Sequence, residues 1–387
     1  MAFFANDAVN RVNLHYGIQA LAQGAGGVFF LVFLLRAGFS APATLAIMAA
    51  IYTARFWLRP ALTPLSVRFG LKAVLIAGAL GMGLQYPCLA AVHGPGWPLV
   101  GLIAASALGD VLYWPSFNAY FATVGDAHHR GHQIGVREAL AAAIGIVAPL
   151  LGAAGLVTIG PGPTFAMVGL VQAASALPLL GAPDVPVKAR APGAWRASRD
   201  LVLFYVTDGW FDACWLFVWQ IGLFMSLGRS ISAYGGAMAL AGVTGAACGL
   251  LIGPRIDAGR WRMAITIAYT LAAAIVAVRA ASLAVPWLAV AANALGALLI
   301  PIISPTIGGA TYNLLKASPC PLRGQVAGEA GWDIGCAAAC LTAAGMLSLG
   351  APIGYAILLG FLGVGAGATQ LWRMYRQLEP GKIRLAA

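Results

Sequence analysis

The sequence predicts an all-α integral membrane protein in which twelve helices span the bilayer. Three observations carry this prediction. Hydrophobic residues make up 60% of the 387-residue chain and charged residues only 9%. The mean hydropathy is +0.84. Apolar runs of about 20 residues or more, each long enough to cross a hydrocarbon core of about 30 Å, recur along the whole chain.

The apolar runs divide into two sets of six around a polar interruption. Those of the first set cover residues 12–35, 43–66, 71–93, 97–124, 132–157 and 162–182. Those of the second set cover residues 201–228, 231–254, 263–284, 286–315, 325–349 and 351–374. Because twelve is an even number, both termini are predicted to lie on the same side of the membrane.

Basic residues predict which side that is. Most of the Lys and Arg residues fall in loops on the side of the termini, and only Arg36, Arg229 and Arg279 fall near the other side. Since cytoplasmic loops are enriched in Lys and Arg, both termini are expected in the cytoplasm, with the protein in the plasma (inner) membrane. The same loops account for the net charge of +11 without nucleic acid as a partner.

The polar interruption predicts the domain organisation. We expect a six-helix bundle over residues 1–183, a cytoplasmic linker over 184–200 and a second bundle over 201–387. The two bundles also share a pattern, because Trp114-Pro115-Ser116 before Arg130-Gly131 corresponds to Ser304-Pro305-Thr306 before Arg323-Gly324. Internal repeats of this kind are typical of secondary transporters, whose site lies at the repeat interface.

Two loops carry a family pattern. The loop between the second and third helices keeps Arg68, Gly70 and Lys72 of a motif that has a Gly, an Asp and then Arg-x-Gly-Arg-Arg, but Val67 stands where the Asp belongs. The loop after the eighth helix keeps Arg255 and Asp257. With its topology, the chain resembles the major facilitator superfamily over its whole length.

The resemblance implies two pseudo-symmetric bundles that move a small-molecule substrate by alternating access, without a cofactor. It also implies loop contacts through Arg68, and through Asp257 in the second half. The fifth helix contains Ala148-Pro149-Leu150-Leu151-Gly152-Ala153, similar to a Gly-Pro-x-x-Gly-Gly element of exporters in this superfamily. This similarity favours export.

The resemblance implies that the first, fourth, seventh and tenth helices line the central cavity. In this sequence the same four helices are also the ones that carry polar residues. Ionisable residues at bilayer depth are costly and normally face a partner or a water-filled cavity. The candidates for substrate binding or proton coupling are His15, Gln19, Gln23, Asp110, Trp114, Asn118, Asp208, Asp212, Trp215 and Tyr312.

Asp208 and Asp212 are the preferred proton-coupling residues. They are one helical turn apart, so their carboxylates repel each other when both are ionised, and we expect one of them to hold a proton. The alternative is that both are neutral or hydrogen-bonded within the protein. For Asp110 the alternative is a buried ion pair.

The aromatic residues near the two aspartates favour an amphipathic organic ligand. These residues are Trp210, Phe211, Trp215, Phe217 and Trp219. Aromatic faces together with carboxylates suit a cation. A Trp-rich helix can equally be core or an interfacial belt, and the sequence leaves both interpretations open.

Two charged pairs predict a cytoplasmic gate. Arg55 and Arg59 are one turn apart on the second helix, and Glu329 and Asp333 are one turn apart on the eleventh. In this family those helices face each other, so Arg59 is expected to pair with Asp333 or Glu329 in one state only. Arg55 has a second interpretation, as the residue that binds an anionic substrate.

Other functional classes have less support. A metal site is not predicted. The histidines His128, His129 and His132 lie beside Arg130, which favours a solvated turn, and Cys336 and Cys340 are more simply explained as small buried thiols. No phosphate-binding loop or catalytic motif occurs, which argues against an ATP-driven pump and an enzyme. We therefore expect a proton-coupled transporter, a monomer in contact with lipid, that exports an amphipathic solute. The alternatives are an uptake carrier for an anionic metabolite and a non-transporting assembly factor or receptor.

Overall fold

The computed structural model describes residues 6–124, 130–252 and 261–378, and within these ranges it contains helices and no strands. Eleven stretches of these described ranges are long and apolar enough to cross a membrane. Ten of them correspond to single predicted spans, and the remaining one, Ala41–Ala90, has 50 residues. A continuous helix of that length would be about 75 Å long, more than twice the hydrocarbon thickness. The stretch therefore has room for two crossings, and the prediction of an all-α, multi-spanning protein is confirmed.

Contacts divide the chain into two compact units, which are described separately. The first unit contains Met1–Arg190 and Leu227–Val243, and the second contains Ala191–Ser226 and Thr244–Ala387. Residues 227–243 group with the first unit through contacts such as that of the Tyr234 hydroxyl, which donates to the backbone oxygen of Val28 at 3.2 Å. The predicted bundle boundaries at 183 and 201 stay a prediction.

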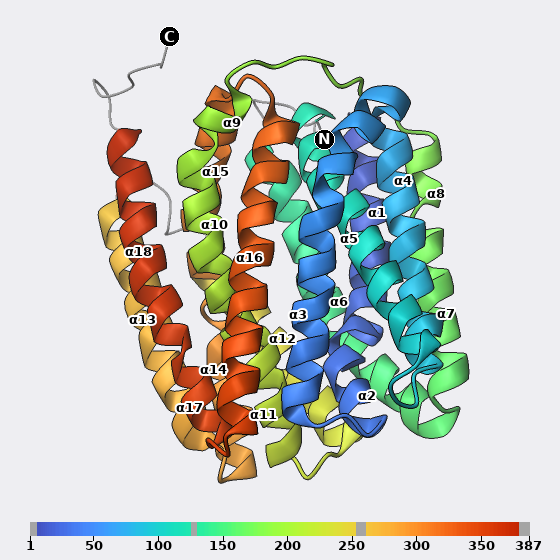
Figure 1. Ribbon diagram of the computed structural model, residues 1–387, viewed down its shortest axis with the longest axis vertical. Coiled ribbons are helices and arrows are strands. Elements are labelled where there is room, and N and C mark those ends of the chain that lie inside the picture. Colours follow the sequence, from blue (N-terminus) through green and yellow to red (C-terminus); the bar gives the residue numbers. More distant parts are fainter. Residues whose placement is uncertain (1–5, 125–129, 253–260, 379–387) are drawn as a thin grey trace. The chain divides into compact units, whose positions relative to one another are not determined.

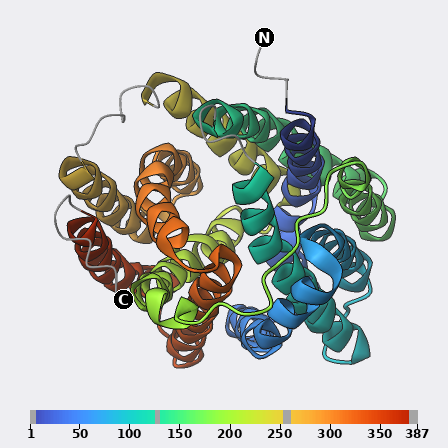
Figure 2. The same ribbon diagram turned by 90° about the horizontal axis from the view of Figure 1, so that it is seen from above.

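The helices of the first unit appear in order along the chain in Figure 1. They are α1 (Asp7–Ala25), α2 (Phe30–Arg36), α3 (Ala41–Leu58), α4 (Leu62–Ala90), α5 (Trp97–Val124), α6 (Arg130–Thr158), α7 (Pro161–Ala174) and α8 (Leu177–Leu180). Helix α4 packs against α5 and α7, and α1 packs against α6 and α7. Figure 2 shows α4 and α5 end-on, side by side. Helix α12 (Ile231–Ile252) runs through the boundary between the units.

The second unit is built around one interrupted helix. Helix α10 (Arg199–Asp212) continues through a π-helical turn (Ala213–Val218) into α11 (Trp219–Ser226). The other helices of this unit are α9 (Ala194–Ala197), α13 (Trp261–Ser282), α14 (Pro286–Ala297), α15 (Ile300–Ala317), α16 (Pro321–Ser348), α17 (Ile353–Leu358) and α18 (Gly360–Gln377). Helix α10 packs against α16 and α18, and α13 lies beside α18 (Figure 1).

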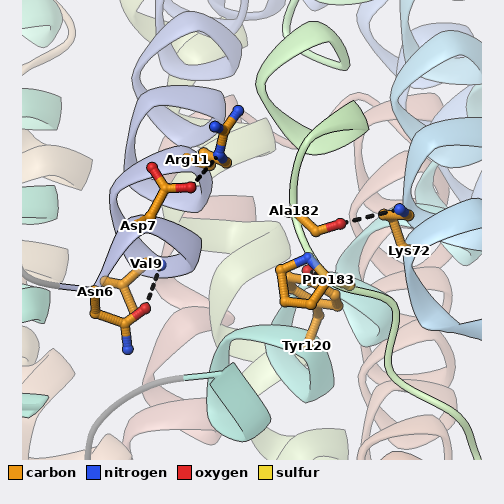
Figure 3. A network of polar contacts seen from close by, with 8 residues as sticks. All are labelled: Asn6, Asp7, Val9, Arg11, Lys72, Tyr120, Ala182 and Pro183. Carbon is orange, nitrogen blue, oxygen red and sulfur yellow. Dashed lines mark hydrogen bonds and ion pairs between the residues drawn. The ribbon is translucent and has the colours of Figure 1, made fainter.

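A cluster of polar contacts ties residues 182 and 183, directly before the predicted linker, to α4 and α5. The Lys72 ammonium group donates to the backbone oxygen of Ala182 at 2.9 Å. The Tyr120 hydroxyl donates to the backbone oxygen of Pro183. Figure 3 shows these four residues, with a dashed line from Lys72 to Ala182, together with the pair of Arg11 and Asp7 at the start of α1.

Asp184 completes this attachment at the break in α4. Gly70 has φ 79°, a left-handed conformation that interrupts the helix. The helical segment after it begins with N–H groups that have no acceptor inside the helix. The backbone N–H of Leu71 donates to Val185 O at 3.0 Å, and that of Lys72 donates to Asp184 Oδ1 at 3.3 Å. Asp184 therefore caps this helix from a segment more than one hundred residues away.

Candidate functional site

His15 of α1 lies in the interior of the first unit with both ring nitrogens bonded. Its side chain is fully buried. Nδ1 lies 2.7 Å from the backbone oxygen of Ser175, and Nε2 lies 2.9 Å from the Tyr113 hydroxyl. Because a backbone oxygen only accepts, Nδ1 carries the proton, and in the neutral ring Nε2 accepts from Tyr113. His15 thus connects α1 to α5 and to the end of α7.

The two glutamines that follow on the same face of α1 differ in their surroundings. Gln19 is 2% exposed, and among the described residues its Nε2 has no hydrogen-bond partner. Gln23 is half-buried, with its side-chain oxygen against Gly27. Gln172 of α7 was not predicted as a site residue, yet it is fully buried, and neither of its amide atoms has a partner in the described part of the chain. Buried glutamines are therefore present on α7 as well as on α1.

Arg55 of α3 and Asp110 of α5 form an ion pair, with Nη1 and Oδ2 3.1 Å apart. The Arg55 side chain is 4% exposed and that of Asp110 is 21% exposed. The Tyr52 ring lies below the guanidinium, 4.9 Å from its carbon to the ring centroid. The sequence pointed to each charge separately, and the structure joins them within one unit. Trp114 and Asn118, further along α5, are half-buried.

Asp208 and Asp212 of α10 are both half-buried in the second unit. Asp212 accepts a hydrogen bond at Oδ2 from the indole Nε1 of Trp332, at 3.1 Å. Tyr269 of α13 is near enough to interact electrostatically with both carboxylates. Neither carboxylate forms an ion pair with any basic residue that the structure describes. The second unit therefore holds two neighbouring acids that have no counter-charge in contact within its described part.

Close packing of α10 against α16 places Trp332 beside Asp212. A Cβ at Gly209 would overlap the backbone of Trp332, so the two helices approach as closely as glycine allows. Gly331 and Gly335 face Val202 and Val206 of α10 in the same way. This approach brings the indole of Trp332 within reach of a carboxylate one turn further along α10.

The tryptophans in and directly after the π-helical turn that follows Asp212 have partners on α13 and α14. Trp215 and Trp219 are 5% and 2% exposed, and both stack on the guanidinium of Arg279 from α13. The Trp219 indole donates to Asn293 Oδ1 of α14 at 2.9 Å. Asp212 and the tryptophans Trp215 and Trp219 therefore have different partners, whereas a shared site was one of the two interpretations that the sequence left open.

The predicted gate residues are all buried in their own units. Arg59 is 1% exposed in the first unit, and Asp333 and Glu329 are 0% and 8% exposed in the second. Gln325 donates to Glu329 Oε1 at 3.2 Å. The gate stays a prediction.

Several other predicted residues are exposed or lie outside the described part of the chain. Arg68 is exposed, with its guanidinium over the Phe69 ring. Residues outside that part are Asp257, His128 and His129, and the side chains of His132 and Tyr312.

Four residues that now define these sites were not predicted as members of them: Arg279, Trp332, Tyr269 and Asp184. Arg279 was counted only as a basic residue near a loop, although its position within an apolar run was a signal for a buried charge. The glycines of α16 at positions 324, 328, 331 and 335 were a signal for a close helix contact. Nothing in the sequence indicated Trp332 as the hydrogen-bond partner of Asp212.

Comparison with solved structures identifies the fold. A POT family transporter in complex with thioalcohol conjugated peptide has a TM-score of 0.72 at 10% sequence identity, over 96% of each chain. The human organic anion transporter MFSD10 (TETRAN) has a TM-score of 0.68 at 16% identity, over 95% of this chain and 99% of that one. The Major Facilitator Superfamily transporter FucP, in the outward conformation, has a TM-score of 0.63 at 15% identity, over 95% of this chain and 98% of that one.

No protein-family model and no curated protein sequence matches the chain. The solved structures named above are transporters rather than enzymes, and they match almost the full length of the chain. Together with the eleven apolar helical stretches, they identify a multi-pass integral membrane protein with the major facilitator fold.

Proposed function

We propose that the protein is a secondary active transporter that moves a small organic solute by alternating access, coupled to protons through Asp208 and Asp212. The observation that carries the proposal is this acidic pair, half-buried in an apolar helix and without an ion-pair partner among the described residues. An ionisable residue inside a membrane-spanning segment is costly and is by default a candidate functional residue. The fold supplies the two halves that alternating access needs.

The spacing of the two acids supports a proton-coupling role. Residues four apart on a helix lie about 6 Å from each other. Two unit charges at that separation repel by about 3 kcal/mol at an effective dielectric constant near 20. The singly protonated pair avoids this cost, so the pair can bind a proton from one side of the membrane and release it to the other. The Trp332 N–H stabilises Asp212 when it is ionised.

We propose export of an amphipathic solute as the first candidate activity. Two carboxylates without a basic partner attract a cationic group, which would compete with the proton for the same site. The exporter-like Ala148-Pro149 element of α6 points in the same direction.

Uptake of an anionic metabolite is the second candidate, and one observation supports it. Arg55 is a buried cation, and MFSD10 is described as an organic anion transporter. In this protein Arg55 already pairs with Asp110, so an anion would have to compete with a carboxylate for the guanidinium. For this reason we rank it second.

A thermal-shift assay on the purified full-length protein tests the proposal. The probes are a panel of cationic, neutral and anionic amphipaths, each measured at mildly acidic and at mildly alkaline pH. We expect saturable stabilisation by cationic compounds, weaker at acidic pH and lost in Asp212→Asn. Asp7→Asn, an exposed acid paired with Arg11, is the matched control and should change nothing.

Two other results would reject the first candidate. Stabilisation by anions that is lost in Arg55→Met would establish the anion carrier instead. Transport into proteoliposomes that ignores both the pH gradient and the two aspartates would rule out proton coupling.

A further inference from the structure

Arg279 is a buried cation whose role is not explained by the acidic pair. It lies in the last turn of α13 and is 4% exposed. No acidic side chain in the described part of the chain pairs with it. Burying a charge without a counter-ion is unfavourable, so the contacts that Arg279 makes instead call for an explanation.

The contacts of Arg279 are with two tryptophans of the interrupted helix, one turn apart. Its guanidinium carbon lies 3.8 Å from the centroid of the Trp215 ring and 4.7 Å from that of Trp219. Its Nη1 donates to the backbone oxygen of Trp215 at 2.9 Å. Arg279 therefore holds both the side chain and the backbone of the same residue, and it stacks on the residue one turn later.

A glycine of α14 lies directly against the Arg279 guanidinium. A Cβ at Gly296 of α14 would overlap the guanidinium, so a larger residue there would displace it. Asn293, one turn earlier on α14, accepts the Trp219 indole N–H. Arg279 is thus fixed from α14 and in turn fixes the turn that contains Trp215.

That turn is the π-helical segment Ala213–Val218, which begins directly after Asp212. A π-helical turn adds about one residue to an α-helix and so rotates everything after it relative to everything before it. In an uninterrupted α-helix, Asp212, Trp215 and Trp219 would share one face, because they are three and seven residues apart. Here Asp212 bonds to α16 while Trp219 bonds to α14.

We infer that Arg279 is a positioning residue. By holding the π-helical turn through Trp215, it sets the direction in which Asp212 points, and so maintains the hydrogen bond from Trp332. The inference rests on the proposed function only in that it makes the position of Asp212 matter for transport. It predicts that a substitution of Arg279 alters the hydrogen bonding of the Asp212 carboxylate, although Arg279 does not contact that carboxylate.

Infrared difference spectroscopy tests this without a substrate. Full-length protein labelled with ¹³C-aspartate is reconstituted in lipid nanodiscs, and the carboxyl band that Asp212→Asn removes is followed as pH is stepped. Because the assignment depends on loss of the band in Asp212→Asn, it holds for either protonation state of Asp212. Trp332→Phe gives its position without the indole hydrogen bond.

We expect Arg279→Met to move the Asp212 band at least halfway toward the Trp332→Phe position. Arg279→Lys, which keeps the charge but not the planar group, should move it less. Gly296→Ala should act like Arg279→Met, and it serves as the second variant if the methionine variant does not fold. Ser282→Ala, which loses only a bond to the backbone oxygen of Arg279, is the matched control.

The two proposals fail in different ways. An Asp212 band that stays in place in Arg279→Met and Gly296→Ala overturns the positioning role, whatever the band does with pH. An Asp212 band that moves in these variants but never changes with pH overturns proton coupling and leaves the positioning role standing.

Discussion

Trp332 of α16 donates its indole N–H to Asp212 Oδ2 of α10 at 3.1 Å, across a contact between the two helices that Gly209 makes possible. The bond joins an acid that the sequence singles out to an aromatic residue that it does not. It places the proposed proton site between helices that belong to one unit. Any change that separates α10 from α16 should therefore act on Asp212.

The first prediction concerns the acidic pair. Asp212→Asn and Asp208→Asn should each lower proton-coupled transport by tenfold or more, because neither amide can carry the proton. An asparagine can still accept the Trp332 bond, so Asp212→Asn should unfold at a temperature close to that of the wild type. The measurement is substrate-driven proton movement in proteoliposomes, with Asp7→Asn as the control. Full coupling in both variants would show that the proton is carried elsewhere.

The second prediction concerns Gly209. Gly209→Val should push α16 away from α10 and break the Trp332 bond, because its side chain would overlap the Trp332 backbone. Overpacking of this kind typically costs about 1–3 kcal/mol of stability. We expect a lower melting temperature together with a loss of coupling similar to that of Trp332→Phe. Gly236→Val is a suitable control, since nothing lies near its missing Cβ. Unchanged coupling in a folded Gly209→Val protein would contradict the role of the helix contact.

The third prediction separates two effects at Gly70. Gly70→Ala should be strongly destabilising, because a side chain there is strained at φ 79° and also meets the Asp184 carboxylate. Strain of this kind costs about 1–3 kcal/mol. Gly160→Ala has a similar φ of 85° with open space around it, so it should show the strain alone. Melting temperatures of the two variants, each also measured with Asp184→Ala, give the contribution of the clash. Equal losses at both glycines would show that Asp184 does not confine Gly70.

The fourth prediction concerns the Arg55–Asp110 pair. Removing one partner leaves the other charge buried, so Arg55→Met alone should cost about 2–3 kcal/mol, a value reduced for the partial exposure of Asp110. The double variant Arg55→Met with Asp110→Asn should recover much of that loss. Chemical denaturation of all four proteins in a double-mutant cycle measures the coupling. Additive losses would mean that the pair contributes little.

The fifth prediction tests the proposed gate by charge reversal. Arg59→Asp and Asp333→Arg should each impair transport, and the combination should restore at least part of it if the two residues pair during the cycle. Vesicle transport rates, normalised to the amount of folded protein, are the measurement. No recovery in the combination, with Glu329→Arg tested in parallel, would reject both pairings.

The spans were predictable because each depends on a local property, an apolar run long enough to cross a bilayer. The predicted span 97–124 and the observed helix Trp97–Val124 coincide. Local chemistry also indicated Asp208 and Asp212, since a charge in such a run is costly wherever its helix packs. These inferences need no knowledge of neighbouring helices.

The direction of each side chain was decided by tertiary structure. A regular helix would group Asp212 with Trp215 and Trp219, and a single aromatic and acidic site was one of the two interpretations that the sequence left open. The π-helical turn shifts the helical phase between them, and that turn is held by Arg279 from a helix more than sixty residues away. Arg55 and Asp110 pair for the same reason, because only the packing of α3 on α5 brings two separate charges within 3.1 Å. The length of an apolar run determines which segments can cross a membrane, whereas interhelical contacts determine which polar groups meet.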